Sequence, residues 1–494
     1  MESKEFIDRE IDAIMQKAWG AFRIYSKYTH KEKKAFLYAI ADELENSGDE
    51  LIKTCMAETN LPEARLKNEK GRTIFQLRSY ADHCENGTWL DARIDTAISD
   101  RVPPKPDIRK MNVPLGPVVV FGPSNFPFAY STAGGDTASA LAAGCPVVVK
   151  AHSGHLKTSE MVSDIIKKAA GRMKMPEGIF SHVYFPSHYV GEALVKHPYT
   201  KAVGFTGSVE VGTLLLKWGN ECKDPIPVFA EMGSVNPVFL MPGKIKESAV
   251  ETAKMYAASI TLGVGQFCTN PGIIIGTEGR DLDIFLSSLG EEIRKIAPAK
   301  MLHKKIAASF TNLLERILLE KGVSVLAVSE MEKCDICGIP TIATVSSEEF
   351  LKNPKLHEEI FGPYSLVVQC KSVDEYSLIA RYMEGQLTCT MMATADDMKM
   401  HGDLIEDIKL LCGRFIVNGV PTGVEVCLSM QHGGPFPATT DGRFSSVGGD
   451  AIKRFVRPLA FQNWPDEMLP DELKNENPLN IYRTINNALT RDKV

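Results

Sequence analysis

The feature that most constrains this chain is a series of short, uninterrupted apolar runs that alternate with helical segments between residues 118 and 205. These runs lack the alternation of a half-exposed strand, which indicates strands buried on both faces. We expect strands over 118–121, 147–149, 179–184 and 202–205, with helices over 134–143, 157–170 and 189–196. Strands joined by helices predict a parallel, doubly wound sheet, and nucleotides bind at the carboxyl ends of such strands.

The regions on either side extend this α/β architecture. Apolar spacings of three and four predict helices over 6–25, 31–51 and 61–84, with a break at 47–49. Further strands are expected at 272–276, 341–345, 364–368 and 415–418, which indicates a second α/β lobe. Prolines at 103, 104 and 106 exclude a helix, and the extended stretch Ile108–Val120 that follows suggests an arm leaving the first lobe.

Composition excludes several classes of function. The formal net charge is −6 and 44% of the residues are hydrophobic, so nothing attracts nucleic acid or anionic lipid over a long range. The N-terminus has alternating charges and no apolar region. No run reaches the roughly 18 apolar residues that a membrane helix needs, so we expect no membrane insertion. The odd count of 11 scattered cysteines favours a reducing compartment, and we expect a cytoplasmic protein.

The one Cys-x-x-Cys motif is formed by Cys334 and Cys337. A zinc site would need two more ligands at short spacing, and no second motif or nearby histidine pair follows. A redox pair is an alternative, but we interpret both as ordinary loop cysteines. We therefore assign no metal.

Three polar residues are candidates for catalysis. Cys268 lies between Gly265 and Gly272, and glycines let backbone amides approach a reacting carbonyl closely. Glu231 follows the apolar strand 228–230, where active-site groups are commonly found. Asn125 could donate its amide to an oxyanion. Taken singly, each residue also has an ordinary explanation: a buried thiol, a solvated acid and a turn-forming amide.

Considered together, five ordered blocks resemble the signature segments of the aldehyde dehydrogenase superfamily, and the resemblance extends from about residue 10 to residue 460. The blocks cover 123–127, 205–208, 231–237, 265–272 and 359–363. Each block is weak alone, but their order makes chance agreement implausible. The resemblance implies a doubly wound cofactor-binding domain (1–100 and 114–233), a catalytic domain (234–435) and bridging, oligomerising segments (101–113 and 455–494).

The resemblance also implies a mechanism for oxidising an aldehyde to its acid. Cys268 would attack the carbonyl, with Asn125 and the backbone N–H of Cys268 holding the oxyanion. Loss of hydride to the nicotinamide would give a thioester, and Glu231 would activate water to hydrolyse it. Glu359 would contact the nicotinamide ribose, and Phe361 would pack near the ring.

The remaining cofactor residues predict which dinucleotide binds. Gly207 and Ser208 would lie at the helix that faces the pyrophosphate. Lys150 matches the family's lysine at the adenosine ribose. At Ser153 many NAD-using members instead have a glutamate that repels a 2′-phosphate. The serine favours NADP as cofactor, with NAD as the alternative.

Details of three segments are similar to the 2,5-dioxovalerate dehydrogenases, a branch that includes NADP-dependent fatty aldehyde dehydrogenases. For a semialdehyde, Arg443 and His432 are candidates to bind the far carboxylate. For a fatty aldehyde, Phe126, Phe128 and Phe436 could form an apolar tunnel. Segment 444–446 does not match the family pattern.

Three further expectations follow. A CoA-acylating enzyme would not need the water-activating Glu231, which argues against that alternative. A non-catalytic relative is disfavoured because the cysteine, glutamate and asparagine are all present. An arm leaves sheet edges unpaired unless another subunit covers them, so we expect a homodimer or homotetramer.

Overall fold

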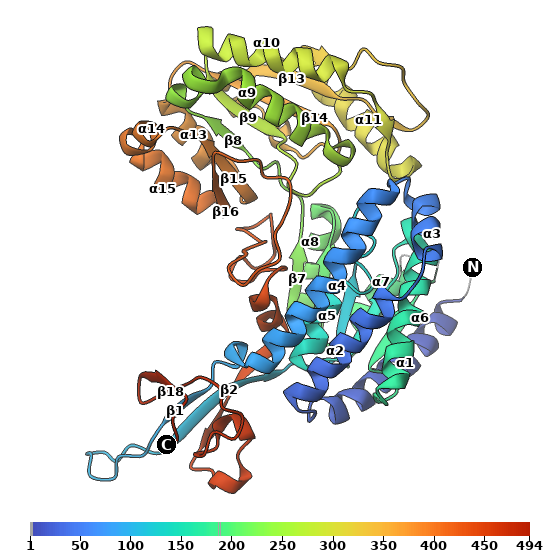
Figure 1. The fold of residues 1–494 in the computed structure, drawn as a ribbon, viewed down its shortest axis with the longest axis vertical. Coiled ribbons are helices and arrows are strands. Elements are labelled where there is room, and N and C mark those ends of the chain that lie inside the picture. The colour runs from blue at the N-terminus through green and yellow to red at the C-terminus, as the bar shows by residue number, and fades with distance from the viewer. Residues whose placement is uncertain (1–2, 186, 188) are drawn as a thin grey trace.

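The computed structural model describes residues 3–185, 187 and 189–494. Two α/β lobes lie one above the other, and an extended arm projects from the lower, N-terminal lobe (Figure 1). The expected fold class is confirmed. Among the described residues, no helix is long and apolar enough to cross a membrane.

The N-terminal lobe is built on a five-stranded parallel sheet with the order β5-β4-β3-β6-β7. Its strands are β3 (Val118–Phe121), β4 (Val147–Lys150), β5 (Phe180–Val183), β6 (Ala202–Thr206) and β7 (Val228–Glu231). Alternate valines of β3 pack into two different hydrophobic clusters. Val118 and Val120 belong to one cluster, and Val119 belongs to the other. The sheet is therefore buried on both faces, as the apolar runs predicted, and Glu231 is the last residue of its strand.

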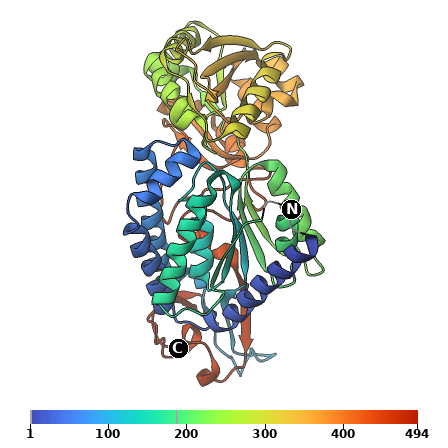
Figure 2. The same cartoon turned by 90° about the vertical axis from the view of Figure 1, so that its right-hand side faces the viewer.

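Helices cover both faces of this sheet (Figure 2). They are α1 (Lys4–Tyr25), α2 (His30–Glu45), α3 (Glu50–Thr59), α4 (Glu63–Asn86), α5 (Gly135–Ala143), α6 (Leu156–Arg172), α7 (Tyr189–Val195) and α8 (Val209–Glu221). Residues of α1, α7 and α8 share the cluster of Val119, whereas α2, α4, α5 and α6 share that of Val118. The predicted break at 47–49 is confirmed, because Gly48 adopts a left-handed conformation with φ of 72° between α2 and α3.

The second lobe contains a seven-stranded sheet with the order β11-β13-β14-β9-β8-β15-β16, parallel except for the edge strand β11. Its strands are β8 (Val238–Leu240), β9 (Ile273–Thr277), β11 (Ser324–Val328), β13 (Thr341–Ser346), β14 (Tyr364–Cys370), β15 (Gln386–Met392) and β16 (Cys412–Val417). Its helices are α9 (Pro242–Thr261), α10 (Arg280–Lys295), α11 (Lys304–Leu318), α12 (Ser347–Lys352), α13 (Asp374–Tyr382), α14 (Ala395–Met400) and α15 (Gly402–Leu411). The four predicted strands are present; β8, β11 and β15 were not predicted.

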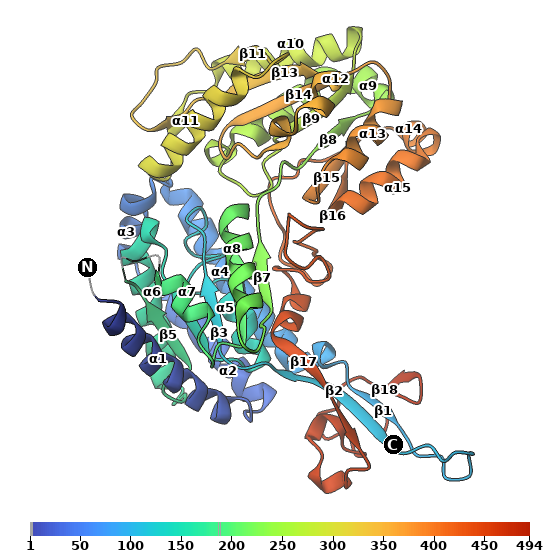
Figure 3. The same ribbon diagram turned by 180° about the vertical axis from the view of Figure 1, so that it is seen from behind.

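The arm joins two segments that are far apart in the sequence (Figure 3). Its sheet has the order β17-β2-β1-β18-β19. The strands are β1 (Arg93–Asp95), β2 (Ile108–Pro114), β17 (Val456–Gln462), β18 (Arg483–Ile485) and β19 (Ala488–Thr490). The predicted boundary at residue 100 places β1 in the cofactor-binding domain, and its residues Arg93–Asp95 pair with Ile108–Lys110 of the arm.

The two cysteines of the Cys-x-x-Cys motif are not the ordinary, unlinked loop cysteines that we expected from the sequence. Cys334 and Cys337 form a disulfide, and Cys337 belongs to β12 (Cys337–Gly338), which pairs with β10 (Ala299–Lys300). The other nine cysteines are free. The expectation that the chain holds no metal stays a prediction.

Candidate active site

A cavity of about 570 Å³ contains most of the residues singled out from the sequence. It is lined by the carboxyl ends of β3, β4, β6 and β7 and by loops of the second lobe. The predicted site residues that line it are Asn125, Phe126, Lys150, Ser153, Gly207, Ser208, Glu231, Cys268, Glu359 and Phe361. Parallel strands end at one edge, which is why residues so far apart in sequence meet here.

The loop that carries Cys268 is held by backbone geometry and by a buried amide. Gly265 has a φ of 63°, and a Cβ there would lie 2.2 Å from the carbonyl oxygen of Gly362, so only glycine fits. The Nδ2 of Asn236 donates to the carbonyl oxygens of Cys268 and Asn270, each at 2.9 Å. The thiol therefore has a fixed position although the loop itself has no regular structure.

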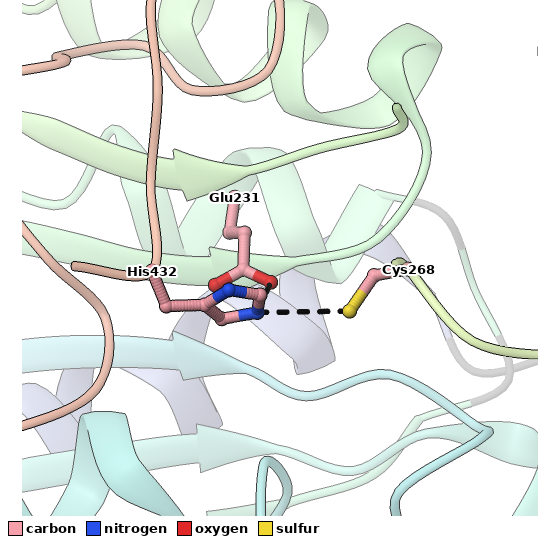
Figure 4. A group of neighbouring side chains, drawn as sticks. All are labelled: Glu231, Cys268 and His432. Carbon is pink, nitrogen blue, oxygen red and sulfur yellow. Dashed lines mark hydrogen bonds and ion pairs between the residues drawn. The ribbon is translucent and has the colours of Figure 1, made fainter. Parts of the chain in front are cut away.

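Glu231, Cys268 and His432 form a compact group with donor atoms within 4.8 Å of one another (Figure 4). The Nε2 of His432 lies 2.9 Å from Oε1 of Glu231 and 3.6 Å from Sγ of Cys268. The hydroxyl of Ser446 donates to the other carboxylate oxygen of Glu231. The imidazole thus bridges the predicted base and the predicted nucleophile.

The pKa values of these groups reflect burial and their neighbours. Burial, reinforced by the negative charge of Glu231, raises the pKa of the Cys268 thiol well above its ordinary value. Burial would also raise the pKa of Glu231, but His432 and the Ser446 hydroxyl outweigh it and lower that pKa overall. The lowered pKa keeps Glu231 ionised, so that it can accept a proton. The raised pKa keeps Cys268 a thiol, which needs a neighbouring base to become a nucleophile.

Asn125 lines the same cavity as Glu231 and Cys268. Its side-chain Nδ2 donates to the carbonyl oxygen of Gln266 at 3.1 Å, which leaves one amide hydrogen unused. Among the described residues, no acceptor is found for the backbone N–H of Cys268. These two N–H groups are the donors that the oxyanion prediction requires.

Glu359 and Phe361 line the cavity beside Gly233. A Cβ at Gly233 would lie 2.3 Å from the Oε2 of Glu359, so this glycine makes room for the carboxylate. Burial raises the pKa of Glu359 to about 8. A polar ligand that hydrogen-bonds to this carboxylate would offset the cost of ionising it.

The opposite end of the cavity is basic. Lys150 ends β4 and is half-buried, and the exposed Ser153 begins the short helix that follows. His152, His303 and Lys305 complete this end, and His303 and Lys305 belong to the second lobe. The carboxylates among the described lining residues are Glu231 and Glu359. The part of the cavity that carries Lys150 and Lys305 is therefore suited to an anionic group.

The N-terminus of α8 also lines the cavity, through Gly207, Ser208 and Val211. Ser208 caps this helix by accepting a hydrogen bond from the N–H of Val211 at 3.4 Å, and the N–H of Gly207 donates to the carbonyl oxygen of Glu231 at 3.0 Å. The unpaired N–H groups of a helix N-terminus favour phosphate. The binding of a pyrophosphate at Gly207 and Ser208 stays a prediction.

Four predicted substrate residues lie elsewhere than expected. His432 contacts the reacting thiol rather than a remote carboxylate. Arg443 is largely exposed and pairs with Asp441, and it is absent from the described cavity lining. Phe128 is buried in the core of the first lobe and Phe436 is exposed, so neither forms a tunnel.

Several residues at the site were not predicted from the sequence. Ser446 lies in the segment that had no match to the family pattern, and that departure was the available signal. Phe267, next to Cys268, packs edge to face on Phe126, which in turn packs on Tyr130. No pattern in the sequence distinguished these aromatic residues from core residues.

Comparison with known proteins identifies the family. The model of the aldehyde dehydrogenase family matches residues 3–435. The chain belongs to the aldehyde dehydrogenase family. It is an NAD(P)-dependent enzyme that oxidises aldehydes, as its five sequence blocks predicted.

Two relatives match this aldehyde dehydrogenase over nearly its whole length. It is 45% identical to alpha-ketoglutaric semialdehyde dehydrogenase 2 of Azospirillum brasilense, over 96% of this chain and 90% of that one. It is 42% identical to alpha-ketoglutaric semialdehyde dehydrogenase of Acinetobacter baylyi, over 98% and 92%.

Solved structures share the fold. A Thermus 1-pyrroline-5-carboxylate dehydrogenase with bound NAD superposes with a TM-score of 0.76 at 19% identity, over 92% of this chain and 86% of that one. A 3,6-anhydro-L-galactose dehydrogenase superposes with a TM-score of 0.78 at 20% identity, over 92% and 91%.

Proposed function

We propose that this aldehyde dehydrogenase oxidises a short semialdehyde of the 2,5-dioxopentanoate type to the dicarboxylate, with NADP as the preferred cofactor. The observation that supports the substrate is the identity of 42–45% to two alpha-ketoglutaric semialdehyde dehydrogenases along almost the entire chain. Long-chain aldehydes are the alternative, and no apolar tunnel formed by the predicted phenylalanines supports them.

In the proposed reaction, Cys268 loses its proton to the adjacent Glu231 and His432 pair and attacks the aldehyde carbon. The 3.6 Å separation of Sγ and Nε2 suits this transfer. The amide of Asn125 and the backbone N–H of Cys268 hold the oxygen as it becomes negative. A nicotinamide bound beside Glu359 and Phe361 would supply the hydride acceptor, and loss of hydride from the carbon on Cys268 would leave an acyl group there as a thioester.

Glu231 then acts on water. Its carboxylate is ionised and lies within 4.8 Å of the sulfur that carries the acyl group. It removes a proton as the water oxygen attacks the thioester carbon, and the C–S bond breaks to release the acid and the thiolate. The thiolate then recovers its first proton from His432, and the proton on Glu231 passes to solvent. A carboxylate placed for this step favours transfer to water over transfer to CoA.

NADP preference rests on the adenosine end of the cavity. Lys150 and Lys305 supply positive charge, and the hydroxyl of Ser153 can donate to a 2′-phosphate. Glu359 and Phe361 would contact the nicotinamide ribose and ring at the other end, with the pyrophosphate at Gly207 and Ser208. The cavity therefore has complementary groups along the whole dinucleotide.

The test is a spectrophotometric panel that compares 2,5-dioxopentanoate, succinic semialdehyde, pentanal and a long-chain aldehyde, each with NAD and with NADP. We expect the highest kcat/KM for 2,5-dioxopentanoate with NADP. A higher kcat/KM for the long-chain aldehyde would contradict the substrate proposal. Acyl-CoA formed when CoA is added, with no free acid in its absence, would contradict hydrolysis.

We also infer that the chain forms a homodimer or homotetramer through the arm. The arm sheet extends beyond the lobes, and large apolar side chains such as Leu489 are exposed on it. Exposed strand edges are usually covered by another chain. Light scattering coupled to gel filtration should give two or four times the chain mass of 54.4 kDa.

A further inference from the structure

An aromatic cluster lies directly beside the nucleophile. Phe126 contacts Tyr130 and Phe267 edge to face, with ring centroids 5.2 and 5.5 Å apart. Phe267 is bonded to Cys268 in the chain, and the ring of Tyr130 is 6.1 Å from that of His432. Phe126 and Tyr130 line the cavity that contains the thiol. A substrate whose aldehyde reaches Cys268 from this side must pass these rings.

Three arginines surround this cluster. Arg65 and Arg72 are seven residues apart on α4 and so share one face of the helix. The Arg65 guanidinium lies 4.6 Å from the centroid of Phe126, and Arg72 donates to the Tyr130 hydroxyl at 3.2 Å. Arg414, on β16 of the other lobe, donates to the carbonyl oxygens of Pro421 at 2.8 Å and Gly423 at 3.1 Å, and Val424, the next residue, packs against the aromatic cluster. Both lobes therefore contribute positive charge.

The three arginines differ in how their charge is balanced. Arg65 lies 3.6 Å from the buried carboxylate of Glu69. Within the part of the chain that the structure describes, neither Arg72 nor Arg414 has a carboxylate within 4.0 Å. The Nε atoms of Arg72 and Arg414 are also buried without a hydrogen-bond partner. Unpaired buried donors and charges are costly, which indicates a missing anion.

The same two arginines act electrostatically on the reaction centre. Burial and the charge of Glu231 raise the pKa of the Cys268 thiol, and Arg72 and Arg414 oppose that rise. Tyr130 is a common neighbour, because its phenol raises the pKa of Arg72 and opposes the fall in the pKa of Arg414. Arg72 therefore reaches the cavity through Tyr130, which lines it, and Arg414 reaches the same aromatic cluster through the segment that carries Val424.

We propose that Arg72 and Arg414 bind the carboxylate of a short ω-oxo acid whose aldehyde carbon is attacked by Cys268. The inference rests on the proposed semialdehyde function and names the residues that select it, in place of Arg443. Guanidinium groups bind carboxylates with paired, charge-assisted hydrogen bonds. Arg65, already paired with Glu69, supports the aromatic wall instead. A long apolar chain would leave both cations unpaired.

The experiment compares wild type with Arg72→Met and Arg414→Met, which keep side-chain bulk and remove the charge. For 2,5-dioxopentanoate we expect kcat/KM to fall by about 10- to 100-fold, the usual effect of losing a charge-assisted hydrogen bond. For pentanal, a neutral aldehyde of the same length, kcat/KM should change less than about threefold. Arg72→Lys should retain part of the selectivity.

Arg78→Met is the matched control, because Arg78 is on the same helix but pairs with Asp42 and Glu45 at the surface. It should leave both substrates unchanged. An equal loss for both substrates in Arg72→Met and Arg414→Met would overturn the inference, since it would indicate an effect on Cys268 or on folding. Unchanged selectivity would overturn it as well.

A second measurement separates this inference from the proposed function. Inhibition by 2-oxoglutarate, the dicarboxylate product, should weaken in Arg72→Met and Arg414→Met even if another aldehyde proves to be the best substrate. If wild type oxidises no oxo acid, the proposed function is wrong. The inhibition result then shows by itself whether Arg72 and Arg414 bind a carboxylate. Equal inhibition of wild type and both variants would overturn it.

Discussion

The two ends of the active-site cavity are constructed in different ways. At the reactive end, Cys268, Glu231 and His432 lie within 4.8 Å of one another, and Ser446 and Asn236 fix the carboxylate and the loop. At the adenosine end, exposed Ser153 and half-buried Lys150 face open space. The reactive end is packed and mutually constrained, whereas the adenosine end consists of separate side chains around a groove.

This difference predicts how each end responds to substitution. In a packed group, each residue sets the pKa and position of the others, so single changes should affect the chemical step strongly and non-additively. In the groove, a change should alter which cofactor binds without altering the chemistry. The following predictions test this contrast, from the largest effect to the smallest.

Cys268→Ser should abolish aldehyde oxidation, with kcat lower by more than about a thousand-fold, because a serine alkoxide is far harder to generate than a thiolate. Cofactor binding, measured by fluorescence titration with NADPH, should be nearly unchanged. A serine variant within a few-fold of wild-type kcat would remove Cys268 from the nucleophile role.

Glu231→Gln should block hydrolysis of the thioester more than its formation. We expect a burst of NADPH close to one equivalent per active site, followed by steady turnover about 10²- to 10⁴-fold slower than wild type. Stopped-flow absorbance at the NADPH band measures both phases. An unchanged steady rate would contradict the role of Glu231, and a missing burst would place it before hydride transfer.

His432→Asn should shift the pH dependence of kcat. Burial raises the pKa of Glu231, and His432 is the largest influence that lowers it. Without the imidazole that pKa should rise, so Glu231 stays protonated, and inactive as a base, up to a higher pH. The acidic limb should move to higher pH, with kcat near neutrality about tenfold lower. In the Glu231→Gln background the shift should disappear; a shift that persists would point to another base.

The sequence predicted the reactive end better than its surroundings. Cys268, Glu231 and Asn125 stand in motifs whose spacing requires a strand end or a glycine turn, and all three line the cavity. The bridging position of His432 depends on a fold that brings residues 231 and 432 together, which no local pattern encodes. Arg72 and Arg414 were missed because a lone arginine on a helix or strand is usually solvated. Their unbalanced charge is visible only in three dimensions.

The adenosine end should respond to Ser153→Glu with a change of cofactor preference. A carboxylate at this position would face the 2′-phosphate of NADP, and two like charges in a partly desolvated groove repel each other. We expect the KM for NADP to rise by about tenfold or more, while the KM for NAD changes little, because NAD has only hydroxyls there. At saturating cofactor, kcat should equal that of wild type, since Ser153 is not part of the group formed by Glu231, Cys268 and His432. Ser153→Ala is the matched control and should weaken NADP binding only slightly, because it removes one hydrogen-bond donor.

The measurement is kcat/KM for both cofactors in wild type, Ser153→Glu and Ser153→Ala. If wild type already prefers NAD, or if Ser153→Glu affects both cofactors equally, Ser153 does not set the preference, and the groove does not differ from the reactive end in the way proposed.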